Sequence, residues 1–226
     1  MKYTIEAEQE LEAGTSYWDC FKGANLRRTE ISFVAFMCQQ FEGTAITGNA
    51  VYFFTQAVVG IETAYNLSVV SLALSCVGVV MSWYLIYRFG RRSLYLFELW
   101  TSLIGLLAVA TAATISNSQK SSYAQASIVI CSVLIRFATT GPVCYAVLAE
   151  ISSVSLRSKT ISIARVAYYI SQIVCNTLQT YLINPTGLNL KGKSGWVWSG
   201  SCSLLIMWAY FCLPETKLST SRTRAS

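Results

Sequence analysis

Residues 67–87 read LSVVSLALSCVGVVMSWYLIY, a run of 21 residues that contains no charged side chain. A helix needs about 20 apolar residues to cross the hydrocarbon layer of a membrane. A strand of a membrane barrel needs only about 10 residues and alternates apolar with polar side chains, which this run does not do. The run therefore predicts a transmembrane helix.

Five further apolar runs accompany this one, and short polar segments separate them. The predicted spans are residues 31–54, 67–87, 93–115, 124–149, 160–183 and 196–213. Of the 226 residues, 54% are hydrophobic and 12% are charged, whereas a soluble domain carries about 25% charged residues. We therefore predict an all-α membrane protein with a six-helix transmembrane bundle over residues 31–213. Polar segments, residues 1–30 and 214–226, flank the bundle.

Positive charges are distributed unevenly between the two sides of the predicted spans. Cytosolic loops of membrane proteins carry the excess of lysine and arginine. Both termini are therefore predicted to be cytosolic, because their side has twelve such residues and the other side three. The twelve are Lys2, Lys22, Arg27, Arg28, Arg88, Arg91, Arg92, Arg157, Lys159, Lys217, Arg222 and Arg224, and the three are Lys120, Lys191 and Lys193.

The composition also argues against an enzyme. The sequence has no histidine, so histidine-based triads and histidine metal sites are excluded. Its eight cysteines show no paired spacing, and we expect them to act as small apolar side chains without disulfides or a metal. No nucleotide-binding loop is present, and we expect no cofactor. The net charge is +6. The positive residues lie between apolar runs rather than in one basic arm, which disfavours nucleic acid as a partner.

Polar side chains inside the first span are candidates for a binding site. In one continuous helix Gln39, Glu42 and Asn49 share a face, and Gln40 flanks it. Amides and carboxylates bind sugar hydroxyls as donors and acceptors, although they also join helices to one another. The carboxyl group of Glu42 is costly at mid-span unless it is paired or protonated. Three explanations are open. Glu42 takes a proton during transport, it pairs with Arg136, or it belongs to a gene copy under little selection.

Three short motifs follow in order at the predicted cytosolic ends of the spans. Residues 88–92 read RFGRR, residues 141–150 read GPVCYAVLAE with Arg157 seven residues later, and residues 214–217 read PETK. Together they resemble the second half of the sugar porter family of the major facilitator superfamily. The stretches SYWDCFKG (16–23), RRTE (27–30), YFF (52–54) and LRSKT (156–160) are similar to fungal α-glucoside, maltose-type permeases.

The charged residues of these motifs suggest a network at one membrane surface. Such a network would hold helix ends together in one conformation and release them in another, as alternating access requires. The alternative is that the positive residues only follow the excess of positive charge on the cytosolic side. The candidates for the network are Arg91, Arg92, Glu150, Arg157 and Glu215.

The resemblance also implies candidate sugar contacts. Gln39, Gln40 and Asn49 resemble a Gln pair and an Asn that contact sugar in the family. Tyr145 stands where the family has a Trp that stacks on the sugar ring, and Gln172 replaces an Asn. The neighbouring Tyr168 and Tyr169 add aromatic surface that a disaccharide would need.

The resemblance implies a function that needs a second part. The family pairs two six-helix halves around a central substrate, and this chain resembles the carboxy-terminal half. An amino-terminal half is therefore an expected partner, a proton the coupling ion, an α-glucoside or hexose the substrate, and a fungal plasma membrane the location. The alternative is a non-transporting fragment or a sugar-sensing, regulatory membrane protein.

Overall fold

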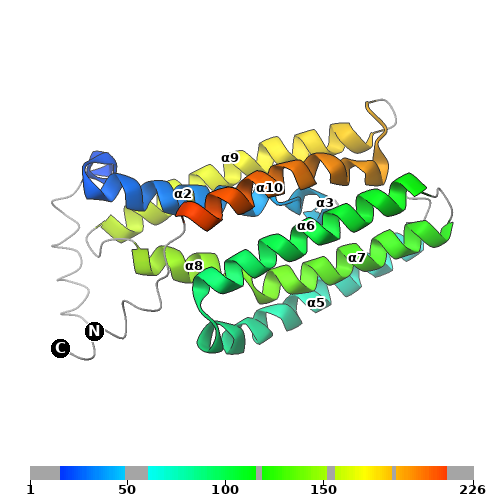
Figure 1. The fold of residues 1–226 in the computed structure, drawn as a ribbon, viewed down its shortest axis with the longest axis horizontal. Helices are drawn as coiled ribbons and strands as arrows, with labels where there is room; N and C mark the ends of the chain where they lie inside the picture. The colour runs from blue at the N-terminus through cyan, green and yellow to red at the C-terminus, as the bar shows by residue number, and fades with distance from the viewer. Residues whose placement is uncertain (1–15, 49–60, 116–118, 152–155, 185–186, 213–226) are drawn as a thin grey trace.

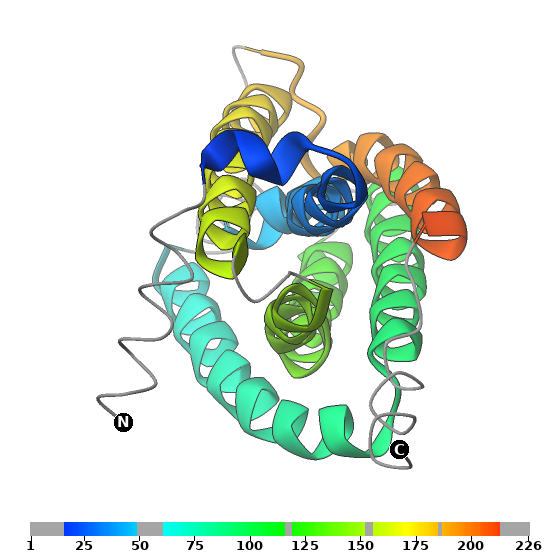
Figure 2. The same cartoon turned by 90° about the vertical axis from the view of Figure 1, so that its left-hand side faces the viewer.

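The structure is a bundle of helices. The computed structural model describes residues 16–48, 61–115, 119–151, 156–184 and 187–212. The long helices lie side by side (Figure 1). Figure 2, viewed from one end, shows α7 and α8 in the middle, with α2, α5, α6, α9 and α10 around them. The elements are η1 (Tyr17–Phe21), α2 (Ala24–Phe41), α3 (Thr44–Gly48), α5 (Ile61–Arg88), α6 (Arg91–Ile115), α7 (Gln119–Ala138), α8 (Thr140–Ile151), α9 (Arg157–Ile183), η3 (Lys191–Lys193) and α10 (Ser194–Cys212).

The first predicted span is not one continuous helix. Helix α2 ends at Phe41, and α3 begins at Thr44. Gly43 between them has φ +90°, a conformation that glycine adopts at little cost. The prediction of an unbroken helix over residues 31–54 is therefore wrong at this point, and residues 49–54 lie outside the described residues. The single-face argument for Gln39, Glu42 and Asn49 loses its basis with it.

The fourth predicted span is also divided, into α7 and α8. Pro142 has no N–H with which to continue the helical hydrogen bonds across the junction, and its ring disfavours an unbroken helix there. The chain instead turns at Thr139, whose N–H donates to the Arg136 carbonyl at 3.2 Å. The other predicted spans each coincide with one helix, and α5 begins six residues before its predicted start.

Small residues allow neighbouring helices to pack closely. A Cβ atom on Gly78 of α5 would lie 2.8 Å from the Leu134 carbonyl oxygen of α7. A Cβ atom on Gly195 of α10 would lie 2.9 Å from the Leu106 carbonyl oxygen of α6. Close backbone approach at small residues is typical of helices that pack within a membrane.

Helix α5 presents an apolar surface to the outside of the bundle. Its exposed side chains include Val69, Val70, Leu72, Val80 and Met81. A continuous surface of this kind is unusual for a soluble monomer and fits contact with lipid or another helical bundle. Within the part of the chain that the structure describes, three helical stretches are long and apolar enough to cross a membrane, namely Ile61–Arg88, Arg91–Ile115 and Ser121–Leu148.

Candidate functional site

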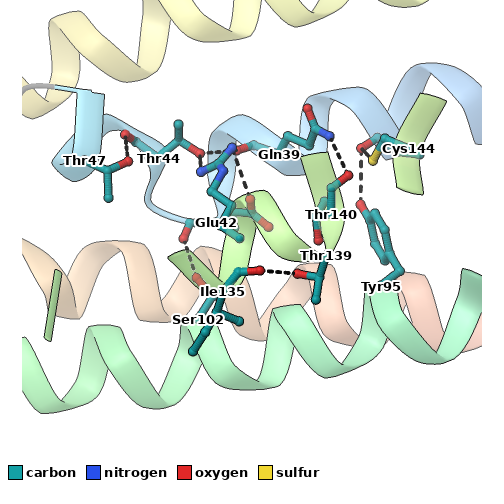
Figure 3. A network of polar contacts seen from close by, with 12 residues as sticks. Gln39, Glu42, Thr44, Thr47, Tyr95, Ser102, Ile135, Thr139, Thr140 and Cys144 are labelled. Carbon is teal, nitrogen blue, oxygen red and sulfur yellow. Dashed lines mark hydrogen bonds and ion pairs between the residues drawn. The ribbon is translucent and has the colours of Figure 1, made fainter. Parts of the chain in front are cut away.

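The predicted polar residues of α2 are buried inside the bundle. Gln39 is 6% exposed and Gln40 is 1% exposed. The side-chain amide of Gln39 donates to the backbone carbonyl of Thr140 at 3.3 Å and so joins α2 to α8 (Figure 3). Within the described residues, Gln40 Nε2 has no hydrogen-bond partner. Contact between a sugar and the Gln39 amide would require α2 and α8 to separate. The sugar-binding role of both amides stays a prediction.

Arg136 of α7 reaches into the break between α2 and α3. Its Nη2 donates to the Gln39 carbonyl at 2.9 Å, and its Nη1 donates to the Thr44 hydroxyl. The Thr44 hydroxyl in turn donates to the Gln39 carbonyl. Arg136 therefore binds backbone and side-chain groups that the end of α2 leaves without helical partners. Figure 3 shows the Thr44 hydroxyl beside the Gln39 carbonyl, with the Gln39 side chain pointing away toward Thr140.

Glu42 forms an ion pair with the same arginine. Its Oε1 lies 3.3 Å from Arg136 Nη2, and the Glu42 side chain is only 1% exposed. The Ser102 hydroxyl of α6 donates to the Glu42 backbone carbonyl at 3.0 Å and fixes this residue from the opposite side (Figure 3). Of the three explanations for Glu42 that the sequence left open, the structure shows the pairing with Arg136.

A second buried carboxyl group, which sequence reasoning missed, completes the cluster. Glu98 of α6 is 3% exposed and lies beside Glu42. It stands one helical turn before Ser102, so the same face of α6 carries both residues toward Glu42. The sequence shows Glu98 as a charged residue inside a predicted span. Its position next to Glu42, however, depends on how α6 packs against α2 and α3.

The cluster borders a small cavity between α3, α6 and α7. Its volume is about 40 Å³, which is enough for a few water molecules because one water needs roughly 10–15 Å³ by this measure. A sugar ring is far larger than this space. The polar residues that line it are Glu42, Thr47, Glu98, Thr101, Ser102, Ser132 and Arg136.

Tyr145 belongs to a different site, an aromatic cluster around Arg165. The guanidinium carbon of Arg165 lies 4.9 Å from the centre of the Tyr145 ring and 5.6 Å from that of Tyr168. The rings of Tyr169 and Phe36 lie at 5.9 Å and 5.7 Å. Each distance falls within the range of a cation–π contact. We call these five residues the Arg165 cluster.

The Arg165 cluster is accessible from outside the bundle. Tyr145 is 45% exposed and Tyr169 is 54% exposed. Gln172, half-buried, follows Arg165 by two helical turns and Tyr168 by one, so it lies on the same side of α9. Tyr145 and Gln172 thus lie in or beside one accessible aromatic and polar surface, separate from the buried Glu42–Arg136 pair.

The predicted charge network is only partly visible. Arg92 Nη2 donates to the Tyr210 carbonyl at 2.6 Å, and its guanidinium lies 5.9 Å from the centre of the Tyr210 ring. It thereby joins the start of α6 to the last turn of α10, whose carbonyls attract cations. Arg91 is half-buried and Arg157 is exposed. The side chains of Glu150, Glu215 and Asn49 lie outside the described residues.

Comparison with known proteins identifies the family. The profile of the family described as "Sugar (and other) transporter" matches residues 1–223. The chain belongs to this sugar transporter family. It is 32% identical over 217 residues to a maltose permease of Saccharomyces cerevisiae, with 96% of this chain and 35% of the permease covered. It is 31% identical over 224 residues to a general alpha-glucoside permease of the same species, with 99% of this chain and 36% of the permease covered. This sugar transporter chain thus spans about a third of the length of those curated relatives.

The fold of this chain matches that of solved xylose–proton symporters. A crystal structure of a D-xylose–proton symporter superposes with a TM-score of 0.74 at 20% identity, covering 95% of this chain and 48% of the symporter. A structure of a major facilitator superfamily proton:xylose symporter bound to 6-bromo-6-deoxy-D-glucose gives a TM-score of 0.71 at 20% identity, covering 84% and 40%. The relatives are membrane transporters, in agreement with the apolar helices.

Proposed function

We propose that this chain is the carboxy-terminal helical bundle of an α-glucoside transporter. The observation that carries the proposal is the similarity, along nearly the whole chain, to maltose and alpha-glucoside permeases. The proposal includes six membrane crossings, with α2 and α3 together as the first and α7 and α8 together as the fourth. Both termini then face the cytosol, and the plasma membrane is the proposed location.

Transport would need a second bundle. The chain corresponds to about a third of its relatives' length, and the solved structures that it matches are about twice the length it covers. We infer that an amino-terminal half, on the same or another chain, completes the substrate cavity. The apolar and aromatic side chains exposed on this bundle would then be covered partly by that half and partly by lipid.

The Arg165 cluster is the proposed sugar-contacting surface. Aromatic rings stack on the apolar faces of sugars, and the guanidinium and amide groups of Arg165 and Gln172 donate hydrogen bonds to hydroxyl groups. Tyr145, half-exposed and held at its edge by the Phe36 ring at 5.4 Å, is the central ring of this surface. Gln39, Gln40 and Asn49 remain candidates for sugar contact in a conformation in which α2 and α8 separate.

The cytosolic charge network is the proposed conformational latch. Arg92 already joins α6 to α10 through the Tyr210 carbonyl. In the proposed network Arg91, Arg92 and Arg157 would pair with Glu150 and Glu215 when the cytosolic ends close. Proton coupling is proposed from the resemblance to proton symporters, and the substrate from the named relatives.

The test is uptake of labelled maltose and glucose by cells that lack their own sugar transporters. One sample expresses this chain alone, and a second adds the amino-terminal half of a yeast maltose permease. We expect maltose uptake by the pair, and a protonophore should abolish accumulation because the proton gradient drives it. If both samples place the chain in the membrane and neither takes up sugar, the chain is a non-transporting fragment or a regulatory relative instead.

A further inference from the structure

Two buried carboxyl groups face one guanidinium group in the water-sized cavity. Glu42 and Glu98 are 2% and 3% exposed, and the side chain of Arg136 is 14% exposed. Arg136 is the positively charged residue among those that line the cavity. With both carboxyl groups ionised, the cluster would carry one uncompensated negative charge in the apolar part of the bundle.

The carboxyl oxygens lack the hydrogen bonds that a buried carboxylate needs. Within the described residues, both oxygens of Glu42 and Oε2 of Glu98 are buried and accept no hydrogen bond. Arg136 contacts only one of them, Glu42 Oε1, in an ion pair without hydrogen-bond geometry. Two adjacent carboxyl groups satisfy each other when they share a proton, because one then donates to the other.

Among the residues that the structure describes, the groups around Glu42 supply no second positive charge. The other titratable side chains near it are uncharged or become negative when they lose a proton. They are Cys38 of α2, Tyr95 of α6, Cys144 of α8 and Cys202 of α10. A metal cation would have to lie beside the Arg136 guanidinium, which repels it. A proton fits the charge balance and needs no more space than the cavity offers.

We propose that Glu42 and Glu98, beside Arg136, form a binding site for one exchangeable proton within this bundle. The proton comes from water that reaches the cavity, and its binding converts one carboxylate to a carboxylic acid. The cluster is then neutral, with one carboxylate, one carboxylic acid and one guanidinium. The site goes beyond the proposed transport function, since proton binding needs neither sugar nor a second half.

The test is infrared spectroscopy of the purified full chain in lipid nanodiscs, without sugar. A protonated carboxyl group shows a carbonyl stretching band that an ionised carboxylate lacks. We expect this band at neutral pH in the wild type, its shift in heavy water, and its loss at strongly alkaline pH. This measurement requires no variant, so misfolding of a variant cannot affect it.

Variants assign the band to the cluster. Glu98→Gln leaves Glu42 paired with Arg136, and Glu42→Gln leaves Glu98 as one carboxylate whose charge the Arg136 guanidinium balances. Each variant should therefore remove the band. Glu62→Gln, at an exposed position in the first turn of α5, should retain it. The inference is overturned if the wild type lacks the band at neutral pH, if both cluster variants retain it, or if the carboxylate signal responds to Na⁺ rather than to pH. Because no transport is measured, failure here leaves the uptake experiment unaffected.

Discussion

At the scale of single residues, Arg136 is the side chain on which the buried cluster depends. It contacts Gln39, Glu42 and Thr44, and so holds the break between α2 and α3 against α7. Glu98 shows why sequence alone did not reveal the cluster. A charge inside a span signals a functional or paired residue, but pairing across three helices depends on their rotation and separation, which the sequence pattern does not contain.

We predict that Arg136→Met destabilises the bundle by about 3 kcal/mol, because it leaves two buried carboxyl groups without a positive partner. Arg136→Lys should recover part of the loss, since it keeps the charge but not the two-pronged contact with Gln39 and Thr44. Arg28→Met, at an exposed position of α2, should change stability by less than about 0.5 kcal/mol. Unfolding in detergent measures all three, and equal effects of the two Met variants would contradict the account.

At the scale of helices, close packing of α5 on α7 makes Gly78 sensitive to substitution. We predict that Gly78→Ala costs about 1–3 kcal/mol, because the new methyl group would lie 2.8 Å from the Leu134 carbonyl oxygen. The matched control is Gly200→Ala in α10, where a Cβ meets nothing within 4 Å. It should stabilise by about 0.5–1 kcal/mol through helix propensity. Thermal unfolding of both variants checks the prediction, and a stabilising Gly78→Ala would refute this packing.

Element η1 packs against α2 and α9 and depends on a partly exposed aspartate. The Ser16 amide donates to Asp19 Oδ2 at 2.8 Å, and Lys22 Nζ donates to Asp19 Oδ1 at 3.1 Å. These contacts, the amide first, hold the pKa of Asp19 below its usual range. These contacts therefore stabilise the folded state at pH values above the pKa that Asp19 has in the unfolded chain. The stabilisation is lost as the pH falls through the lower pKa that Asp19 has in the folded state.

We predict that Asp19→Asn loosens η1 and exposes the buried Cys20, whose Sγ lies 3.9 Å from the Thr160 hydroxyl. The measurement is maleimide labelling of Cys20 in a chain whose other cysteines are replaced by serine. Rates are compared as a ratio of variant to wild type, because acid itself slows the thiol reaction. The ratio should exceed one at neutral pH and approach one in acid. A ratio that does not change with pH would show that Asp19 has no such role.

Much of the helical organisation follows from hydropathy, whereas the breaks do not. The apolar runs predicted where α5, α6, α9 and α10 lie, because an apolar run of this length with at most one charged residue favours a helix. The breaks at Gly43 and before Pro142 carry local signals, but a span-length apolar window averages over a single glycine or proline. The burial of Gln39 and Gln40 could not be predicted either. The spacing of residues along a helix shows which of them share a face, but not what packs against that face.

At the scale of the whole molecule, the bundle combines a buried ionic cluster with an accessible aromatic surface. The buried cluster fixes α2, α3, α6 and α7 relative to one another. The Arg165 cluster, on α2, α8 and α9, presents half-exposed rings that another bundle and a substrate could cover. The two proposals therefore place proton binding and sugar contact in different parts of one helical bundle.

We have proposed that this chain supplies the sugar-contacting aromatic surface of a transporter. The most direct test is the initial rate of labelled maltose uptake by cells that co-express the chain with an amino-terminal half, for wild type, Tyr145→Phe and Tyr145→Ala. A loss of about 1 kcal/mol of ring-stacking energy corresponds to a roughly fivefold weaker interaction with the sugar. We therefore predict near wild-type uptake for Tyr145→Phe and about fivefold slower uptake for Tyr145→Ala. Wild-type uptake by Tyr145→Ala, at equal amounts in the membrane, would contradict the claim.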